Sequence, residues 1–115
     1  VFPHMKGKLT SNAVRVPVPN VSLAILSLMV KKQTTVEEVN NALINASKSP
    51  FYKDVLAVAH EPLVSSDIVQ SKYSAIVDLQ MTKVIDGDLV KVLAWYDNEW
   101  GYSNRLVELA TFIGA

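Results

Sequence analysis

Long runs of apolar residues separated by short polar breaks predict that this chain forms a β-sheet. Residues 21–30 are almost wholly apolar, broken only by Ser22 and Ser27. A strand of this kind has apolar side chains on both faces, so we expect both faces to be covered. Asp86-Gly87 is typical of a tight hairpin turn and connects the last two predicted strands. The further strands are expected at residues 55–60, 73–81 and 88–96.

Two other segments lack a clear period. Residues 13–19 carry Pro17 and Pro19 at alternate positions. Because proline cannot donate to a sheet ladder, this segment is either an edge strand or an extended crossing, and not a central strand. Residues 63–68 are ambiguous, and we interpret them as extended.

Two stretches have helical periodicity. Residues 35–38 form a capping box, in which Thr35 accepts from the Glu38 amide and the Glu38 side chain reaches back. The helix that follows is stopped by Pro50, which disfavours helix at Ser49. Its apolar face is formed by Val36, Val39, Ala42, Leu43 and Ala46. A second helix is expected from about residue 100 to residue 113, with Leu106, Leu109, Ala110 and Ile113 on one face.

The order of these elements predicts an α+β fold. We expect a mostly antiparallel sheet with one covering helix and a C-terminal helix. The 115 residues suffice for one domain at ~100–150 residues per domain. Since the main strands are apolar on both faces, a single covering helix leaves one face of the sheet exposed. An exposed apolar face of this size is unusual on a monomer, so we expect it to have a partner.

The charge balance and the residue types exclude several classes of function. Eleven basic and eleven acidic residues give a formal net charge of +0, which argues against nucleic acid or an anionic membrane as the main partner. No apolar run reaches the ~18 residues that span a bilayer. The chain contains no cysteine and therefore no thiol nucleophile, and His4 and His60 lack the spacing of metal ligands.

A polar and aromatic junction at residues 94–105 separates the last predicted strand from the last helix. It holds both tryptophans of the chain, together with Asp97, Asn98 and Asn104. Two interpretations are open. Asp97 or Asn98 can act as a helix N-cap beside a tryptophan core, which is a structural role. Alternatively, the amides and carboxylates form a binding site, because strand-to-helix junctions often present ligand-binding groups.

The junction resembles the C-terminal signature of the phosphorylating glyceraldehyde-3-phosphate dehydrogenases. Residues 95–105 match it with the sequence WYDNEWGYSNR, and residues 7–10, 15–22 and 64–67 match the family in the same order. The resemblance implies that residues 1–115 are a partial, C-terminal part of a catalytic domain whose Rossmann domain is absent here. The related erythrose-4-phosphate dehydrogenases share this layout, but Tyr96, Tyr102 and Ser103 favour the glyceraldehyde-phosphate branch.

The resemblance also implies roles for individual residues. Arg15 matches the arginine that holds the substrate phosphate, and a planar guanidinium suits bidentate phosphate contact. Asn98 matches the asparagine that binds the nicotinamide carboxamide, and Tyr102 matches a tyrosine near the nicotinamide ring. The cofactor is therefore NAD or NADP, and the choice between them depends on residues outside this chain. In the family a cysteine attacks the aldehyde and a histidine takes the proton.

The same resemblance sets the expected partners. The catalytic cysteine and histidine and the Gly-rich dinucleotide turn are missing from this chain, so we expect the isolated chain to be inactive and to bind no cofactor. Its partners would be its own N-terminal Rossmann portion and further subunits of a cytoplasmic homotetramer. The alternative is a stand-alone α+β module for assembly or binding, without catalytic activity. An upstream Gly-rich turn followed by a Cys and a His would separate the two hypotheses.

Overall fold

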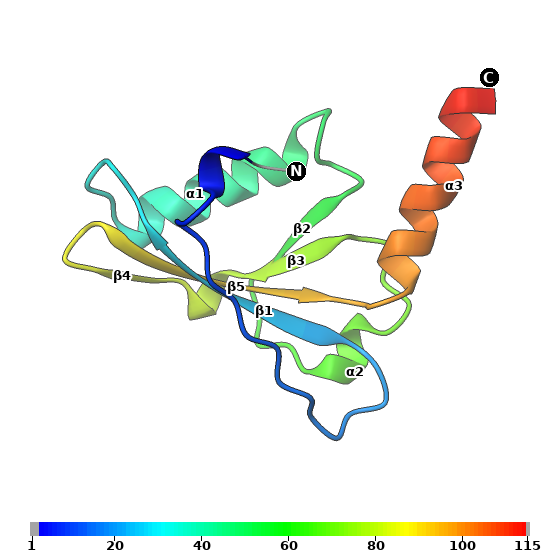
Figure 1. Ribbon diagram of the computed structural model, residues 1–115, viewed down its shortest axis with the longest axis horizontal. Helices are drawn as coiled ribbons and strands as arrows, with labels where there is room; N and C mark the ends of the chain where they lie inside the picture. The colour runs from blue at the N-terminus through cyan, green and yellow to red at the C-terminus, as the bar shows by residue number, and fades with distance from the viewer. Residues whose placement is uncertain (1–2, 115) are drawn as a thin grey trace.

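The computed structural model describes residues 3–114 and shows a sheet with helices around it (Figure 1). In chain order, its elements are a 3-10 helix at Pro3–Met5, β1 (Ser22–Met29), α1 (Val36–Lys48), β2 (Leu56–Ala59), α2 (Ser65–Ile68), β3 (Ala75–Asp78), a second 3-10 helix at Leu79–Met81, β4 (Lys83–Ile85), β5 (Leu89–Tyr96) and α3 (Trp100–Gly114). Among residues 3–114, none of the helices is long and apolar enough to cross a membrane.

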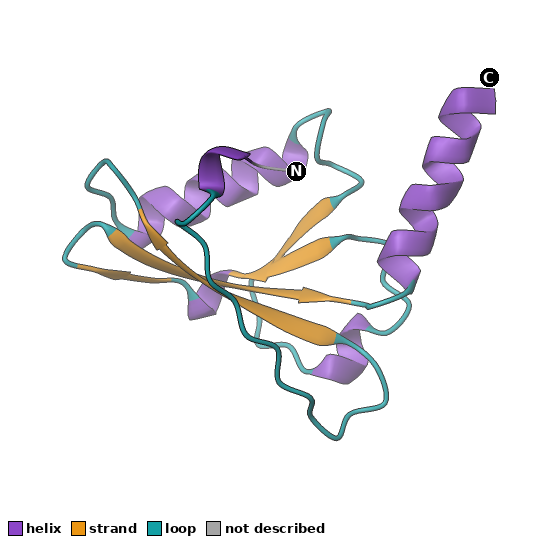
Figure 2. Ribbon diagram, viewed as in Figure 1, coloured by secondary structure: helices purple, strands orange, loops and turns teal. Residues whose placement is uncertain are grey.

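The sheet is mixed but mostly antiparallel, which confirms the predicted α+β class. The strand order is β1-β5-β3-β2, and β4 pairs with the beginning of β5. Only β2 and β3 run parallel, and the other pairs are antiparallel. Helix α1 lies along one side of the sheet, whereas α3 projects away from the body as a separate arm (Figure 2).

Strand β5 is the centre of the fold because it pairs with three other strands. It runs beside β1 from Ser22–Tyr96 to Met29–Leu89. Since side chains alternate along a strand, one face of β5 presents Val90, Val92 and Ala94, which are buried. These three pack with Val77 and Leu79 to form the core, and Val39, Leu43 and Ile44 of α1 cover them.

The ends of α1 follow from its sequence. The Thr35 hydroxyl accepts from the Glu38 amide at 3.2 Å, which confirms the predicted N-cap. The other half of the predicted capping box is different, because the Glu38 carboxylate accepts from the Thr34 hydroxyl at 3.0 Å. The helix ends at Lys48, where extended backbone at Ser49 leads into Pro50, as predicted.

Two strand predictions need correction in detail. Asp86 and Gly87 both have positive φ, at 49° and 77°, as a tight hairpin turn requires. However, the strand before this turn is β4, and the apolar run at residues 73–81 contains only the four-residue β3. That run leaves the sheet after Asp78, whose carboxylate accepts from the Gln80 amide at 3.1 Å and caps a 3-10 turn.

The two segments without a clear period also have definite structures. Residues 63–68 are not extended, since residues 65–68 form the short helix α2. The reason is local: the Asp67 carboxylate accepts from the Val64 amide at 2.8 Å and closes the turn. Residues 13–19 belong to none of the strands in the described part of the chain, which agrees with the extended crossing and not with an edge strand.

Within residues 3–114, the strand at residues 21–30 is exposed on both faces over its second half, so the expectation that both faces are covered stays a prediction about the intact protein. Ile25 and Met29, which point to one face of β1, are 58% and 72% exposed, and Leu26 and Leu28 on the other face are also exposed. The cause is the position of α1, which packs against β2 and the core and does not cover β1. Apolar surface therefore remains on both sides of the outer strand.

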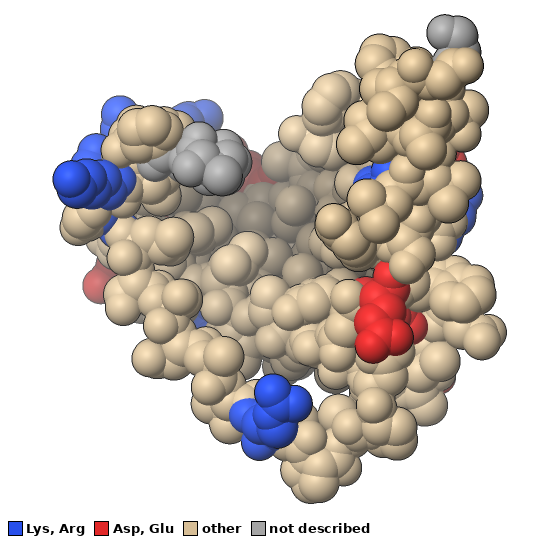
Figure 3. All heavy atoms as spheres, turned by 45° about the vertical axis from the view of Figure 1, so that its right-hand side comes forward, with Lys and Arg blue, Asp and Glu red and all other residues tan. Residues whose placement is uncertain are grey.

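Helix α3 spans the residues predicted for it, but its apolar face has no cover within the described residues. Phe112 and Ile113 near its end are 81% and 73% exposed. Figure 3 shows α3 as an arm whose surface in this view carries few charged side chains. Apolar surface of α3 is therefore exposed in this chain.

Candidate functional site

The junction between β5 and α3 is organised by Asp97, which is only 4% exposed. Its Oδ1 accepts from the backbone amides of Glu99 at 3.0 Å and Trp100 at 2.8 Å, and so caps α3. Its Oδ2 accepts from the Gln70 amide at 2.9 Å and from Asn20 Nδ2 at 3.0 Å. One carboxylate thus joins the segment before β1, the loop after α2 and the start of α3.

These hydrogen bonds set the charge state of Asp97. Burial by itself raises the pKa of a carboxyl group, because it disfavours the ionised form. Here the donors from Trp100, Glu99, Gln70 and Asn20 outweigh burial and lower the pKa of Asp97 from 3.8 to about 2. A carboxylate that is ionised at all ordinary pH values and already holds four donors is an anchor, not a proton-transfer group.

Asn98 and Tyr102, two of the three predicted site residues, lie together beside this anchor. They line a hollow of about 250 Å3 where β5 meets α3. The Ser22 hydroxyl donates to Asn98 Oδ1 at 2.6 Å, and Tyr102 is 65% exposed. The hollow is lined by Ser74, Tyr96, Asp97, Asn98, Gly101, Tyr102 and Arg105.

The first turn of α3 packs closely against the backbone of the segment before β3. Gly101 is buried, and a Cβ at that position would lie 2.8 Å from the Tyr73 carbonyl oxygen. Arg105 donates to the Ser74 hydroxyl at 3.1 Å and forms an ion pair with Glu108 on the same helix. Because of these contacts, the first turn of α3 carries Tyr102 at a defined place beside Asn98.

Arg15, the third predicted site residue, lies elsewhere. It is exposed in the extended segment before β1 and does not line the hollow of Asn98 and Tyr102. The structure therefore unites the two residues expected to meet the cofactor and leaves the one expected to meet the substrate phosphate outside.

Sequence reasoning missed several residues that build the site. Ser22, Gln70 and Gly101 were not assigned any role, although Ser22 and Gly101 lie in stretches that match the family. The match to the family in these stretches could therefore have pointed to Ser22 and Gly101. For Gln70 we find no signal in the sequence. It contributes its backbone amide and not its side chain, and its φ of 64° is not one that its residue type predicts.

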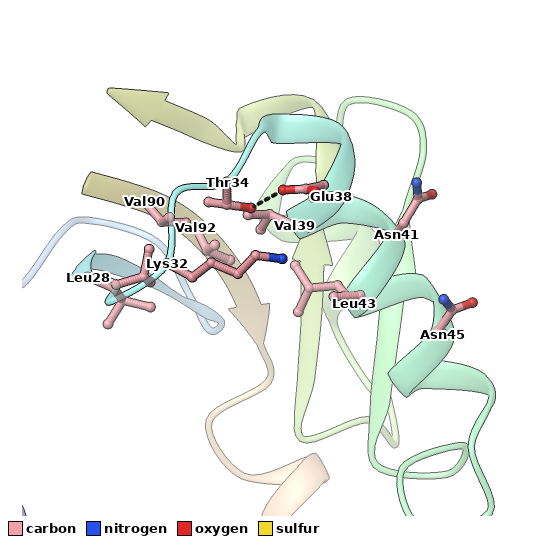
Figure 4. A pocket seen from close by; sticks show the side chains of 12 residues that line it. Leu28, Lys32, Thr34, Glu38, Val39, Asn41, Leu43, Asn45, Val90 and Val92 are labelled. Carbon is pink, nitrogen blue, oxygen red and sulfur yellow. Dashed lines mark hydrogen bonds between the residues drawn. The ribbon is translucent and has the colours of Figure 1, made fainter. Parts of the chain in front are cut away.

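A second hollow, a groove of about 740 Å3, runs between α1 and the strands β1 and β5 (Figure 4). Its walls are mostly apolar, and the hydrogen bond between Thr34 and Glu38 lies at one end. None of the three predicted site residues lines it. Within residues 3–114, no cluster of three or more His, Asp or Glu side chains could hold a metal ion.

Comparison with known proteins gives one consistent family. Residues 1–98 match the model of the glyceraldehyde 3-phosphate dehydrogenase C-terminal domain. The whole chain is 51% identical to glyceraldehyde-3-phosphate dehydrogenase 2 of Bacillus subtilis, covering 34% of that protein. It is 50% identical over its whole length to glyceraldehyde-3-phosphate dehydrogenase 2 of Staphylococcus aureus, covering 33% of it. The chain spans about a third of the length of the curated relatives it matches. It belongs to the glyceraldehyde 3-phosphate dehydrogenase family, and most of it matches the C-terminal domain of that family.

Proposed function

We propose that this chain is the C-terminal part of the catalytic domain of an NAD(P)-dependent phosphorylating glyceraldehyde-3-phosphate dehydrogenase. The observation that carries the proposal is the hollow that holds Asn98 and Tyr102 beside the Asp97 anchor, in a chain of this family. In the intact enzyme, residues 1–115 would supply contacts to the nicotinamide and to the substrate phosphate. The enzyme would work in glycolysis, in the cytoplasm.

The chemistry of the hollow suits a nicotinamide group. The Asn98 amide offers both an acceptor and donors, which is the complement of a carboxamide, and the exposed Tyr102 ring offers an apolar face. Bound NAD(P) would accept the hydride of the substrate. The contribution of Asn98 and Tyr102 is to orient the ring, which matters because hydride transfer needs close and aligned approach.

Arg15 would bind the phosphate of the substrate. It is exposed, so its guanidinium is free of burial, and a bidentate contact to a phosphate is the interaction that arginine makes best. The nucleophile and the base would come from the upstream part of the subunit, because this chain contains no cysteine. We therefore expect the isolated chain to form no NADH from an aldehyde.

The exposed apolar surfaces support further contacts in the intact protein. Exposed apolar patches larger than a few hundred Å2 are unusual on monomers. We propose that the upstream Rossmann portion covers α3 and that the outer face of β1, with Ile25 and Met29, contacts a second subunit. The expected assembly is a homotetramer with isologous interfaces.

The test is steady-state kinetics of the full-length enzyme with Arg15→Leu and Asn98→Ala. Arg15→Leu should raise the KM for the phosphorylated aldehyde much more than the KM for NAD, since a charge-assisted contact is worth ~1.5–3 kcal/mol. Asn98→Ala should lower kcat. Lys53→Leu, which removes an exposed cation from the loop after α1, is the matched control and should change neither constant.

The outcomes separate the proposal from its alternative. Equal rises of both KM values in Arg15→Leu, or no rise, would reject the phosphate role. An unchanged kcat in Asn98→Ala would reject the nicotinamide role. If the full-length protein has no dehydrogenase activity at all, the chain is instead an assembly or binding module.

A further inference from the structure

Val21 has an unusual backbone for its residue type. Its φ is 80°, in the left-handed region, and the residue is only 5% exposed. A β-branched residue is unfavourable in this region because its Cβ crowds the backbone. Such conformations persist only where the surroundings impose them, and they concentrate at functional sites. The contacts on either side of Val21 therefore need an explanation.

The two residues beside Val21 are bonded to two consecutive residues of the site. Asn20 Nδ2 donates to Asp97 Oδ2 at 3.0 Å, and the Ser22 hydroxyl donates to Asn98 Oδ1 at 2.6 Å. In a regular strand, residues two apart point to the same face, whereas consecutive residues point to opposite faces. The left-handed turn at Val21 changes the direction of the chain, so that both side chains reach their partners.

The two bonds differ in what they can do. The bond to Asp97 joins a carboxylate that already holds three backbone amides, and so it belongs to the anchor. The bond to Asn98 is made to a side chain that lines the open hollow. A hydroxyl can donate to an amide oxygen or accept from an amide nitrogen, so the Ser22 hydroxyl can bond the Asn98 amide in either of its two orientations. The bond therefore restrains where the amide lies beside the hollow.

We propose that Ser22 is a positioning residue, which holds the Asn98 side chain in place beside the hollow through the strained Val21 turn. With Oδ1 held by Ser22, its other lone pair and the two Nδ2 hydrogens stay available at one place in the hollow. A primary carboxamide can be recognised there, because it brings one acceptor and one donor group. The inference rests on the proposed function, since it takes the nicotinamide carboxamide as the partner of Asn98.

The test uses the full-length protein and two ligands, NAD and ADP-ribose. ADP-ribose contains the adenosine and both phosphates but lacks the nicotinamide. Ser22→Ala should raise the Kd for NAD roughly tenfold, the size expected for one lost hydrogen bond, and leave the Kd for ADP-ribose unchanged. Titration calorimetry measures both values without any turnover. Ser27→Ala, which removes an exposed serine further along β1, is the matched control and should change neither value.

Two conservative variants keep the test clear if Ser22→Ala folds poorly. Ser22→Thr keeps the hydroxyl and should restore the Kd for NAD to within about twofold. Ser22→Cys keeps the shape with a weak donor, and its Kd for NAD should rise while that for ADP-ribose does not. A merely structural role would instead raise both Kd values together, or lower the melting temperature without changing either.

The same titrations with Asn98→Ala distinguish the failure of this inference from failure of the proposed function. If Asn98→Ala weakens NAD alone and Ser22→Ala does not, then Ser22 has no positioning role and the function of Asn98 stands. If Asn98→Ala leaves both Kd values unchanged, the nicotinamide assignment is wrong and the inference is wrong with it. If Asn98 contacts the nicotinamide and Ser22 positions it, then adding Ser22→Ala to Asn98→Ala should not raise the Kd for NAD any further.

Discussion

Replacing Asp97 with asparagine keeps the shape of the side chain and removes its charge. One oxygen remains to cap α3, but an amide nitrogen takes the place of the oxygen that accepts from Gln70 and Asn20. Both of these donors would then face another donor. Hydrogen bonds to a charged group are each worth ~1.5–3 kcal/mol, so we expect the free energy of unfolding to fall by about 3 kcal/mol at pH 7.

The loss depends on pH, and its sign follows from the lowered pKa. The pKa of Asp97 is 3.8 in the unfolded chain and about 2 in the fold, so the ionised carboxylate stabilises the native state above pH 3.8. A tenfold change in proton affinity is worth ~1.36 kcal/mol, which makes this contribution about 2 kcal/mol. It should be complete above about pH 5 and disappear as the pH falls through 2.

The assay is urea unfolding of the 115-residue chain between pH 7 and pH 2, followed by the fluorescence of Trp95 and Trp100 on either side of Asp97. The difference in free energy between wild type and Asp97→Asn should stay constant down to about pH 5 and then shrink by about 2 kcal/mol. Asp54→Asn is the control, because Asp54 is exposed in its ion pair with Lys72 and should matter little at any pH. A difference that does not change with pH would refute the role of the charge.

Three further predictions concern packing, strain and assembly. Gly101→Ala should destabilise the fold by about 1–3 kcal/mol in urea unfolding, because the added Cβ meets the Tyr73 carbonyl oxygen; Gly114→Ala, which meets nothing within 4 Å, should not. Val21→Gly should be more stable than Val21→Ala by about 1 kcal/mol, and the opposite order would show that the positive φ is not strained. The isolated chain should self-associate in size-exclusion chromatography with light scattering, and a stable monomer at high micromolar concentration would contradict the proposed interface.

The periodicity of the sequence was sufficient to predict most of the helices and strands. The positions of α1 and α3 and the turn at Asp86-Gly87 all follow from local patterns, and the structure agrees. The failures have local causes too. We interpreted residues 63–68 as extended and residues 79–81 as part of a strand, but carboxylates at Asp67 and Asp78 close turns there. A side chain that competes for the backbone overrides a weak period.

The candidate site could be predicted only in part, for a different reason. Asp97 was recognised as a possible cap, and it is one, but its second oxygen holds residues that are 27 and 77 positions away in the chain. No local pattern contains such pairs. The roles of Ser22 and Gln70 also depend on backbone turns with positive φ at residues whose types do not favour them.

The sequence pattern predicts least well which part of the protein, or which other chain, covers an apolar side chain. An apolar side chain indicates that burial is favourable, but not which chain provides the cover. Ile25, Met29 and Ile113 are apolar and would be core residues by pattern, yet all three are exposed here. They lie on the outer strand β1 and on the projecting α3, neither of which contributes a residue to the core around β5. Meanwhile the anchor at Asp97 depends only on residues within this chain. The contacts that place Asn98 are therefore built from residues of this chain, whereas the apolar surfaces of β1 and α3 are exposed in it, and their cover by other parts of the protein stays a proposal.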